Sequence, residues 1–187
     1  MGTMKDAKTY GGIGAILMLI GLFFPILIIV GLILLFISVK TIADITQDRK
    51  IFDHFLYYFI LAIVGSIAMM VLFVSVLFMS GNFNPSQITP DIVIAFIVPF
   101  VVGWIFFVFS ALYLRKSYTA IYEKTNVDAF RTTGKLYFIG ALLTIVFVGL
   151  IIIFIARIFE IIAYFGLPED YAEKPMAGTE QPVERIV

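Results

Sequence analysis

The chain has 187 residues, of which 61% are hydrophobic, and a formal net charge of +0 at pH 7. A typical soluble domain is about 45–50% apolar, so a water-soluble fold of this length could not bury so much apolar surface. The balanced charge and the lack of a basic stripe argue against nucleic acid as a partner. Because the chain has no cysteine, disulfides, thiolate nucleophiles and cysteine-bound metals are excluded.

Four long apolar runs follow one another, at residues 10–39, 55–79, 92–114 and 136–156, and none contains a charged residue or a histidine. Each is long enough for a helix to cross about 30 Å of hydrocarbon. Apolar and polar residues do not alternate as in barrel strands. The sequence therefore predicts an all-α, polytopic transmembrane helical bundle over residues 1–165, with a polar, disordered tail over residues 166–187.

The first run, residues 10–39, is about ten residues too long for one upright crossing. Pro25 is a candidate helix break, because it lacks a backbone donor and clashes with the carbonyl of Gly21. Lysines flank both ends of the run, and basic residues favour the cytoplasm. We therefore favour a re-entrant hairpin that turns near Phe23 and Phe24 and lies against the central helices; the alternative is a single tilted helix.

The two central runs are joined by residues 80–91, which contain no Lys or Arg, whereas the connections at residues 40–54 and 115–135 are basic. The positive-inside rule places residues 80–91 outside the cell and the connections at residues 40–54 and 115–135 in the cytoplasm. Pro99 is a second candidate helix break, since it frees the carbonyl of Ala95. We expect an outward-pointing hairpin.

We expect Asn126 to end the helix that extends from the second central run, and Val127 to begin the entry to the last one. Residues 136–156 are expected to form one crossing that leaves the acidic tail outside. Arg157 and Glu160 follow it, three residues apart and so on one helix face. We interpret them as an interfacial ion pair that ends the span; the alternative is a contact with a substrate or a lipid headgroup.

Small residues four positions apart allow close approach of transmembrane helices. We interpret three such pairs as packing contacts within one subunit rather than as an oligomer interface: Gly11 with Ala15, Ala62 with Ser66, and Gly140 with Thr144. The hydroxyls within the runs, of Ser66, Ser75, Ser110 and Thr144, are expected to bond to carbonyls of their own helices. A polar pore lining is the alternative.

No catalytic, cofactor-binding or metal-binding residue is predicted. The apolar runs lack the ionisable groups that coupled pumps use. His54, the single histidine, neighbours Asp53 but has no clustered partners of the kind that a metal or a general base requires. We expect a protein that is not an enzyme.

One stretch of sequence occurs twice, as VGLILLFIS at residues 30–38 and VGLIIIFIA at residues 148–156. The triplet Ile-Gly-Ala likewise occurs at residues 13–15 and 139–141, and the first copy holds eight extra residues between the two landmarks. Either an ancient duplication or chance similarity between apolar segments would explain this internal similarity.

The segments YGGIGAILMLIG, VGLILLFISVKTIAD and FRTTGKLYFIGA, with the closing FGLPE, resemble the uncharacterised, mainly archaeal membrane family catalogued as domain-of-unknown-function 996. The resemblance covers roughly residues 8–170. It implies a multi-pass protein of the cell envelope and carries no known reaction or binding residues.

We therefore expect a non-enzymatic structural or scaffolding membrane component. Its partners would be membrane lipids and either a second copy of itself or another membrane protein. The alternatives are a transporter or channel for a small neutral or lipidic solute, lined by helices broken at proline, and an enzyme acting on lipid headgroups.

Overall fold

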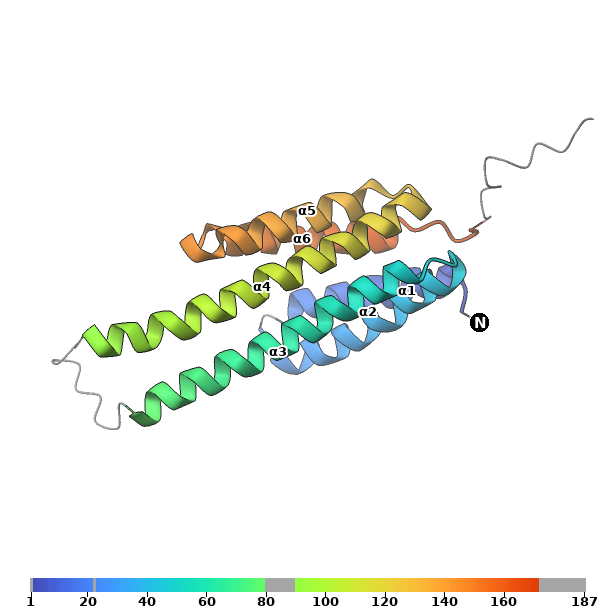
Figure 1. The fold of residues 1–187 in the computed structure, drawn as a ribbon. Helices are drawn as coiled ribbons and strands as arrows, with labels where there is room; N and C mark the ends of the chain where they lie inside the picture. Colours follow the sequence, from blue (N-terminus) through green and yellow to red (C-terminus); the bar gives the residue numbers. More distant parts are fainter. Residues whose placement is uncertain (1, 22, 80–89, 172–187) are drawn as a thin grey trace, which may run out of the picture.

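The computed structural model describes residues 2–21, 23–79 and 90–171, and these form a bundle of α-helices (Figure 1). The α-helices are α1 (Met4–Ile20), α2 (Pro25–Ile45), α3 (Arg49–Met79), α4 (Pro90–Thr125), α5 (Asp128–Leu143) and α6 (Val148–Phe165), with a short 3-10 helix, η1 (Thr144–Val146), before α6. Within this part of the chain, four helices are long and apolar enough to cross a membrane. The predicted fold class, an all-α polytopic bundle, is confirmed.

The helices form three hairpins, α1 with α2, α3 with α4, and α5 with α6. The α3–α4 hairpin reaches well beyond the turns of the other two (Figure 1). Helix α5 packs on α4, α6 packs on α1, and α2 touches α3 along a shorter contact. The two outer hairpins therefore meet through α1 and α6.

Helix α1 begins with a capping box. The backbone N–H of Thr3 donates to the carboxylate of Asp6 at 2.7 Å, and the backbone N–H of Asp6 donates to the Thr3 hydroxyl at 3.2 Å. These contacts satisfy backbone donors at the helix start. The hydrogen bonds from Thr3 also hold the pKa of Asp6 below its ordinary value.

The first apolar run divides into α1 and α2, as the hairpin interpretation requires, and Pro25 is the first residue of α2. The expectation that the turn lies against the central helices is wrong, because Phe23 and Phe24 are 79% and 61% exposed. The turn forms its own hydrogen bonds: the N–H groups of Gly21 and Phe24 donate to Leu17 and Ile20 at 2.8 and 3.3 Å. A turn that satisfies its own backbone groups needs no protein around it.

The last apolar run is not one crossing, and the prediction of a single helix over residues 136–156 is wrong. Helix α5 ends at Leu143, η1 follows, and Phe147 adopts a left-handed backbone conformation (φ 61°) before α6 begins. The chain reverses here without a proline. The N–H of Phe147 donates to Thr144 at 3.0 Å and that of Leu150 donates to Phe147 at 3.1 Å, so this turn also satisfies backbone groups locally.

The other expected breaks have different outcomes. Asn126, with φ 56°, separates α4 from α5, as predicted. Pro99 lies inside α4 and does not end it, so its assignment as a helix break is wrong. One missing hydrogen bond in a helix of 36 residues leaves the other turns intact, and unwinding them in lipid would expose further backbone groups.

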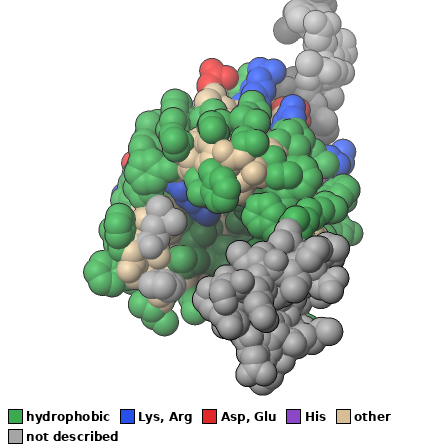
Figure 2. All heavy atoms as spheres, turned by 90° about the vertical axis from the view of Figure 1, so that its left-hand side faces the viewer, with side chains coloured by type: hydrophobic (Ala, Val, Ile, Leu, Met, Phe, Trp, Pro, Cys, Tyr) green, Lys and Arg blue, Asp and Glu red, His purple; other side chains and the backbone are tan. Residues whose placement is uncertain are grey.

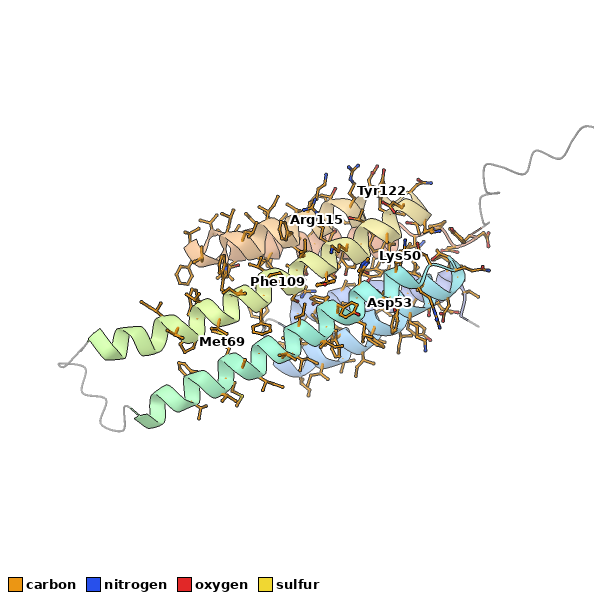
Figure 3. The ribbon with its side chains drawn as sticks, in the orientation of Figure 1. Lys50, Asp53, Met69, Phe109, Arg115 and Tyr122 are labelled. Atoms are coloured by element: carbon orange, nitrogen blue, oxygen red, sulfur yellow. The ribbon has the colours of Figure 1, made fainter. Side chains whose placement is uncertain are left out.

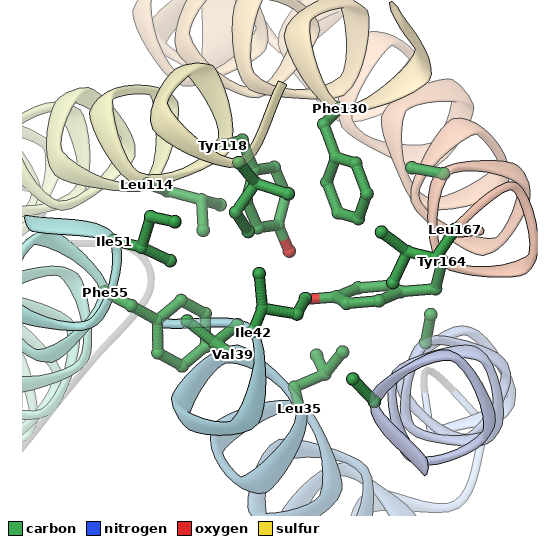
Figure 4. Close-up of a cluster of buried hydrophobic side chains, with 14 of the residues drawn as sticks. Leu35, Val39, Ile42, Ile51, Phe55, Leu114, Tyr118, Phe130, Tyr164 and Leu167 are labelled. Carbon is green, nitrogen blue, oxygen red and sulfur yellow. The ribbon is translucent and has the colours of Figure 1, made fainter. Parts of the chain in front are cut away.

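The buried core lies at the end of the bundle where the charged residues gather. There, Leu35 and Ile42 of α2, Tyr118 of α4 and Phe130 of α5 lie around the ring of Tyr164 of α6 (Figure 4). Further along α3 and α4 the apolar side chains turn outward; examples are Ile67, Met70, Ile97 and Phe109. The bundle is therefore tightly packed at its charged end and open along its apolar length.

The tail begins later than expected. Leu167 is 1% exposed and belongs to the core, and Tyr171 packs on that core. The carboxylate of Glu169 pairs with the amine of Lys8 at 3.3 Å. This pair places the start of α1 and the end of α6 at the same end of the bundle. Because α5 and α6 form a hairpin and Gly166 lies near Val127, the end of α6 also returns to the start of α5. The expectation that one crossing separates the tail from the last basic connection is therefore also wrong. Residues 172–187 lie outside the described part of the chain.

Candidate functional site

A cluster of buried polar side chains joins three helices at the charged end. Its centre is Glu160 of α6, whose side chain is 1% exposed. One carboxylate oxygen accepts a short hydrogen bond from the hydroxyl of Tyr118 on α4. The other accepts from the hydroxyl of Tyr137 on α5 at 3.1 Å and from the guanidinium of Arg157 at 2.8 Å.

Arg157 is held on both sides. Its guanidinium carbon lies 5.0 Å from the centre of the Tyr137 ring, and the phenol of Tyr58 lies near it. A buried ion pair is stable only when further hydrogen bonds and contacts compensate for the lost water, and Tyr118 and Tyr137 supply them. The predicted pairing of Arg157 with Glu160 is confirmed, and both residues lie within α6, which continues to Phe165.

Tyr164 lies beside this cluster without joining it. Its ring packs edge to face against Tyr118 and Phe130, and its hydroxyl is buried with no hydrogen-bond partner among the described residues. Gly11 of α1 lies directly against the ring and near the Ser38 hydroxyl, so any side chain at Gly11 would displace Tyr164. The predicted small-residue pair Gly11 and Ala15 thus lies where α1 meets α2 and α6.

The apolar part of the bundle contains a groove. A cavity of about 320 Å³ lies between α3 and α4 and reaches Thr144 beyond α5; it is lined by Leu61, Ala62, Gly65, Ser66, Met69, Phe100, Gly103, Trp104, Phe107 and Thr144. A cavity of about 330 Å³ shares Ala62 and Ser66 with it and extends to α1 and α2. A third, of about 400 Å³, shares Met69 and Phe100 and extends to Phe147. We name these three adjoining cavities the membrane groove.

The membrane groove is apolar although two hydroxyls border it. Those of Ser66 and Thr144 donate to carbonyls of their own helices, of Ala62 at 2.7 Å and Gly140 at 2.8 Å. Trp104 donates its indole N–H to the Ala141 carbonyl at 3.0 Å, which fixes α4 to α5 beside the groove. Seen along the bundle from the end with the hairpin turns, a hollow lies among hydrophobic side chains, with a basic side chain deeper in (Figure 2).

The other predicted residues have separate places. Gly140 faces the backbone of Gly149 across the α5–α6 hairpin. The hydroxyl of Ser110 donates to the Tyr58 carbonyl on α3 at 3.2 Å, so it joins two helices rather than bonding within its own. The side chain of Ser75 lies outside the described residues. His54 lines a separate pocket between α3 and α4, and the described residues contain no group of three potential metal ligands.

Tyr118 and Tyr137 of the cluster, and Tyr164 beside it, are not among the predicted site residues. Aromatic residues near the ends of apolar runs are typical of a membrane interface. The sequence therefore does not distinguish these tyrosines from ordinary interfacial residues. A signal was present in Arg157 and Glu160, because a charged pair that is buried next to an apolar run requires further polar partners.

Comparison with known proteins relates the chain to one family and to one archaeal relative. The family model described as "Protein of unknown function (DUF996)" matches residues 27–158. The "Uncharacterized protein MJ1644" of Methanocaldococcus jannaschii is 38% identical over 168 residues, which are 89% of this chain and 94% of that protein. No solved structure matches.

Proposed function

We propose that this chain, which belongs to the DUF996 family, is a non-enzymatic membrane scaffold. In this role it would hold lipid chains in the membrane groove. The observation that carries this proposal is the groove itself. It is apolar, it lies along α3 and α4 and extends to both outer hairpins, and its hydroxyls donate to backbone carbonyls.

The proposed topology places the charged end of the bundle in the cytoplasm. The connections at residues 40–54 and 115–135 contain three and five Lys or Arg residues, and residues 80–91 contain none. Basic connections favour the cytoplasm, so residues 80–91 would be external. Both termini of the bundle would then be cytoplasmic, because Lys8 and Glu169 pair.

In this topology only α3 and α4 cross the membrane completely. Over their whole lengths α2 and α6 are long enough to cross, but their uncharged parts rise only about 22 and 14 Å. Those of α1 and α5 rise about 16 and 12 Å, and all four are short of about 30 Å of hydrocarbon. Phe23 and Phe147, at the two turns, are largely exposed and apolar. Both outer hairpins would enter and leave on the cytoplasmic side and end within the lipid.

This topology opens the groove toward the bilayer. Beyond the short hairpins, α3 and α4 have fewer protein neighbours, and apolar side chains such as Met69 and Phe100 border the opening. Cavities of 300–1,000 Å³ are the usual size of small-ligand sites, and the occupant expected at membrane depth is an acyl or isoprenoid chain. The exposed side of α3 would receive a second copy of the chain or another membrane protein.

A carrier of a lipidic solute is the second candidate, because the membrane groove touches Ser66 and Thr144. A carrier would need the groove to open at both membrane faces, whereas the core closes its cytoplasmic end. A lipid-headgroup enzyme has less support, since both oxygens of the buried Glu160 carboxylate already accept hydrogen bonds.

The test is to fill the groove. Ser66→Phe places a ring between α3 and α4, whereas Val64→Phe places the same ring two positions earlier, on the opposite face of α3, where Val64 is 45% exposed. We expect Ser66→Phe to reduce labelling of the protein by a photoactivatable lipid whose reactive group is at the chain terminus, and Val64→Phe to leave it unchanged. Equal labelling of both variants would contradict the proposal.

A further inference from the structure

A second pocket lies at the charged end, on the outer face of the α3–α4 hairpin. It has a volume of about 520 Å³ and is lined by Asp48, Lys50 and His54, with Leu112, Arg115, Lys116, Thr119, Ala120 and Glu123. The α4 residues recur at intervals of three and four and so form one helix face. Tyr118 and Ile121 of α4 are buried in the core, so the pocket opens away from it and is separate from the membrane groove.

Three cations of this pocket have no acidic partner. Lys50, Arg115 and Lys116 form no ion pair within the described residues. They come from two helices and lie in the half of the bundle that holds the charged end, as Lys50 and Arg115 illustrate (Figure 3). Three positive charges around one pocket would repel one another, and this repulsion is relieved when an anion binds between them.

The acidic residues of the pocket do not neutralise these cations. Asp48 is already engaged, by the Lys124 amine at 3.8 Å and by the backbone N–H of Lys50 at 3.1 Å. Glu123 lies eight residues beyond Arg115 on the same helix, about 12 Å away along its axis. The end of the pocket nearer the apolar part of the bundle is therefore positive.

Aromatic rings hold two of the cations in place. The Lys116 amine lies 4.9 Å from the centre of the Tyr113 ring, and the Arg115 guanidinium lies 5.3 Å from that of Phe138. Tyr113 in turn lies beside Tyr57 and His54, at ring distances of 5.3 and 6.2 Å. Tyrosines with one polar edge favour the depth of lipid headgroups, and Leu112 supplies an apolar wall.

We propose that this pocket binds the phosphate headgroup of an anionic membrane lipid. Lys50, Arg115 and Lys116 would contact the phosphate, with the Arg115 guanidinium offering paired donors. The lipid chains would run along the exposed apolar surface beside Phe109, which is 53% exposed on α4. The pocket thus matches a ligand with an anionic head and an apolar tail.

The test compares two double variants that remove equal charge. Arg115→Gln with Lys116→Gln changes the pocket, and Arg131→Gln with Lys135→Gln changes exposed residues of α5 outside it. Native mass spectrometry of the full-length protein would measure retention of phosphatidylglycerol, with phosphatidylcholine as the neutral lipid. At about 1 kcal/mol for each basic residue, the pocket variant should bind phosphatidylglycerol roughly thirtyfold more weakly, and the α5 variant should bind it as the unchanged protein does.

Equal losses in the two double variants, or none in either, would overturn the proposal. Melting midpoints show whether the variants are folded; if the pocket double variant is not, Lys50→Gln alone should weaken retention about fivefold. Inorganic phosphate is added as a competitor. Displacement of phosphatidylglycerol by inorganic phosphate would assign the pocket to a soluble phosphate compound and overturn the lipid assignment, whereas retention supports it.

Discussion

Gly14 and Gly31 face one another across the first hairpin, so closely that a Cβ atom on either would lie within 3.0 Å of the other's carbonyl oxygen, at 2.9 and 2.8 Å. Gly140 and Gly149 face one another across the α5–α6 hairpin in a similar way: a Cβ atom on Gly140 would lie 3.1 Å from the Gly149 carbonyl oxygen, and one on Gly149 would lie closer still to that of Gly140. Gly14 and Gly140 are the central residues of the repeated Ile-Gly-Ala triplet, and Gly31 and Gly149 belong to the repeated VGL segment. The two contacts therefore join equivalent positions of the two copies. This agreement favours duplication over chance similarity.

The repeat also accounts for the eight extra residues of the first copy. Gly14 and Gly31 are 17 positions apart, whereas Gly140 and Gly149 are nine apart. The turn lies midway between the glycines in both hairpins. The extra residues therefore lengthen each arm of the first hairpin by four residues beyond the glycine contact, which is about one helical turn or 6 Å.

We predict that Gly14→Ala lowers the stability of the protein in detergent. The added methyl group meets backbone atoms of α2, which can move only with the helix, and overpacking of this kind costs about 1–3 kcal/mol. Gly103→Ala is the matched control, because its methyl group meets the sulfur of the flexible Met69 side chain at 2.8 Å. A lower melting midpoint is expected for Gly14→Ala alone; equal midpoints would contradict the close contact.

The same reasoning applies to the α5–α6 hairpin. Gly140→Leu should separate α5 from α6, because a Cβ atom there lies 2.7 Å from Ile153 and 3.1 Å from the Gly149 carbonyl oxygen. A lower melting midpoint is expected, and an unchanged one would mean that the leucine side chain finds open space.

We predict opposite effects for two buried tyrosines. Tyr118→Phe removes a donor to Glu160 and leaves a carboxylate oxygen without that partner, which costs about 1–3 kcal/mol. Tyr164→Phe removes a hydroxyl that has no partner among the described residues, so stability should be unchanged or higher. Both substitutions keep the ring, so each serves as the control for the other in thermal unfolding. A larger loss of stability for Tyr164→Phe than for Tyr118→Phe would show that the Tyr164 hydroxyl has a hydrogen-bond partner.

We predict that Glu160→Gln is strongly destabilising, by about 3–5 kcal/mol, because it leaves the buried Arg157 without a counter-charge. Glu169→Gln is the control: it removes the partner of Lys8 at the surface, where ion pairs contribute about 0–1 kcal/mol. Unfolding in detergent measures both. If the two variants were equally stable, the charge on Glu160 would have to serve binding rather than folding.

The sequence was sufficient for the fold class, for the hairpin at Pro25 and for the break at Asn126. Long uncharged runs, a proline and a turn-forming residue each act through local physics that the sequence displays. The turn at Phe147 has no such signal, because residues 144–148 (TIVFV) contain neither glycine nor proline. There the close contact between Gly140 and Gly149 brings the two arms together, and this is a tertiary effect that overrides the apolar pattern.

The candidate sites were harder to predict for a related reason. Arg157 and Glu160 were recognised as a pair, but their tyrosine partners lie 23 and 42 residues from Glu160 along the chain. Ala62, Ser66 and Thr144 were assigned to helix packing by their spacing, and the structure places all three at the membrane groove. Spacing identifies a helix face but does not show whether protein or lipid covers that face.

The last prediction tests the topology. The chain has no cysteine, so single cysteines can be introduced and labelled with a membrane-impermeant maleimide in intact and in inverted vesicles. Cysteines at Lys5, Asn126 and Glu169 should react only from the cytoplasmic side, because these exposed residues lie at the charged end. A cysteine at Asn84 should react only from the opposite side, since the connection that contains it has no basic residue.

Cysteines at Phe23 and Phe147 distinguish re-entrant hairpins from complete crossings. Both residues lie at hairpin turns and are largely exposed, so in detergent both should react. In vesicles they should react from neither side, because the uncharged arms that lead to them are shorter than the hydrocarbon thickness and the turns satisfy their own backbone hydrogen bonds. Reaction of a cysteine at Phe147 from the side opposite Asn126 would show that α5 and α6 each cross the membrane. The membrane groove would then be enclosed along its length rather than open to lipid, and a carrier would become the better assignment.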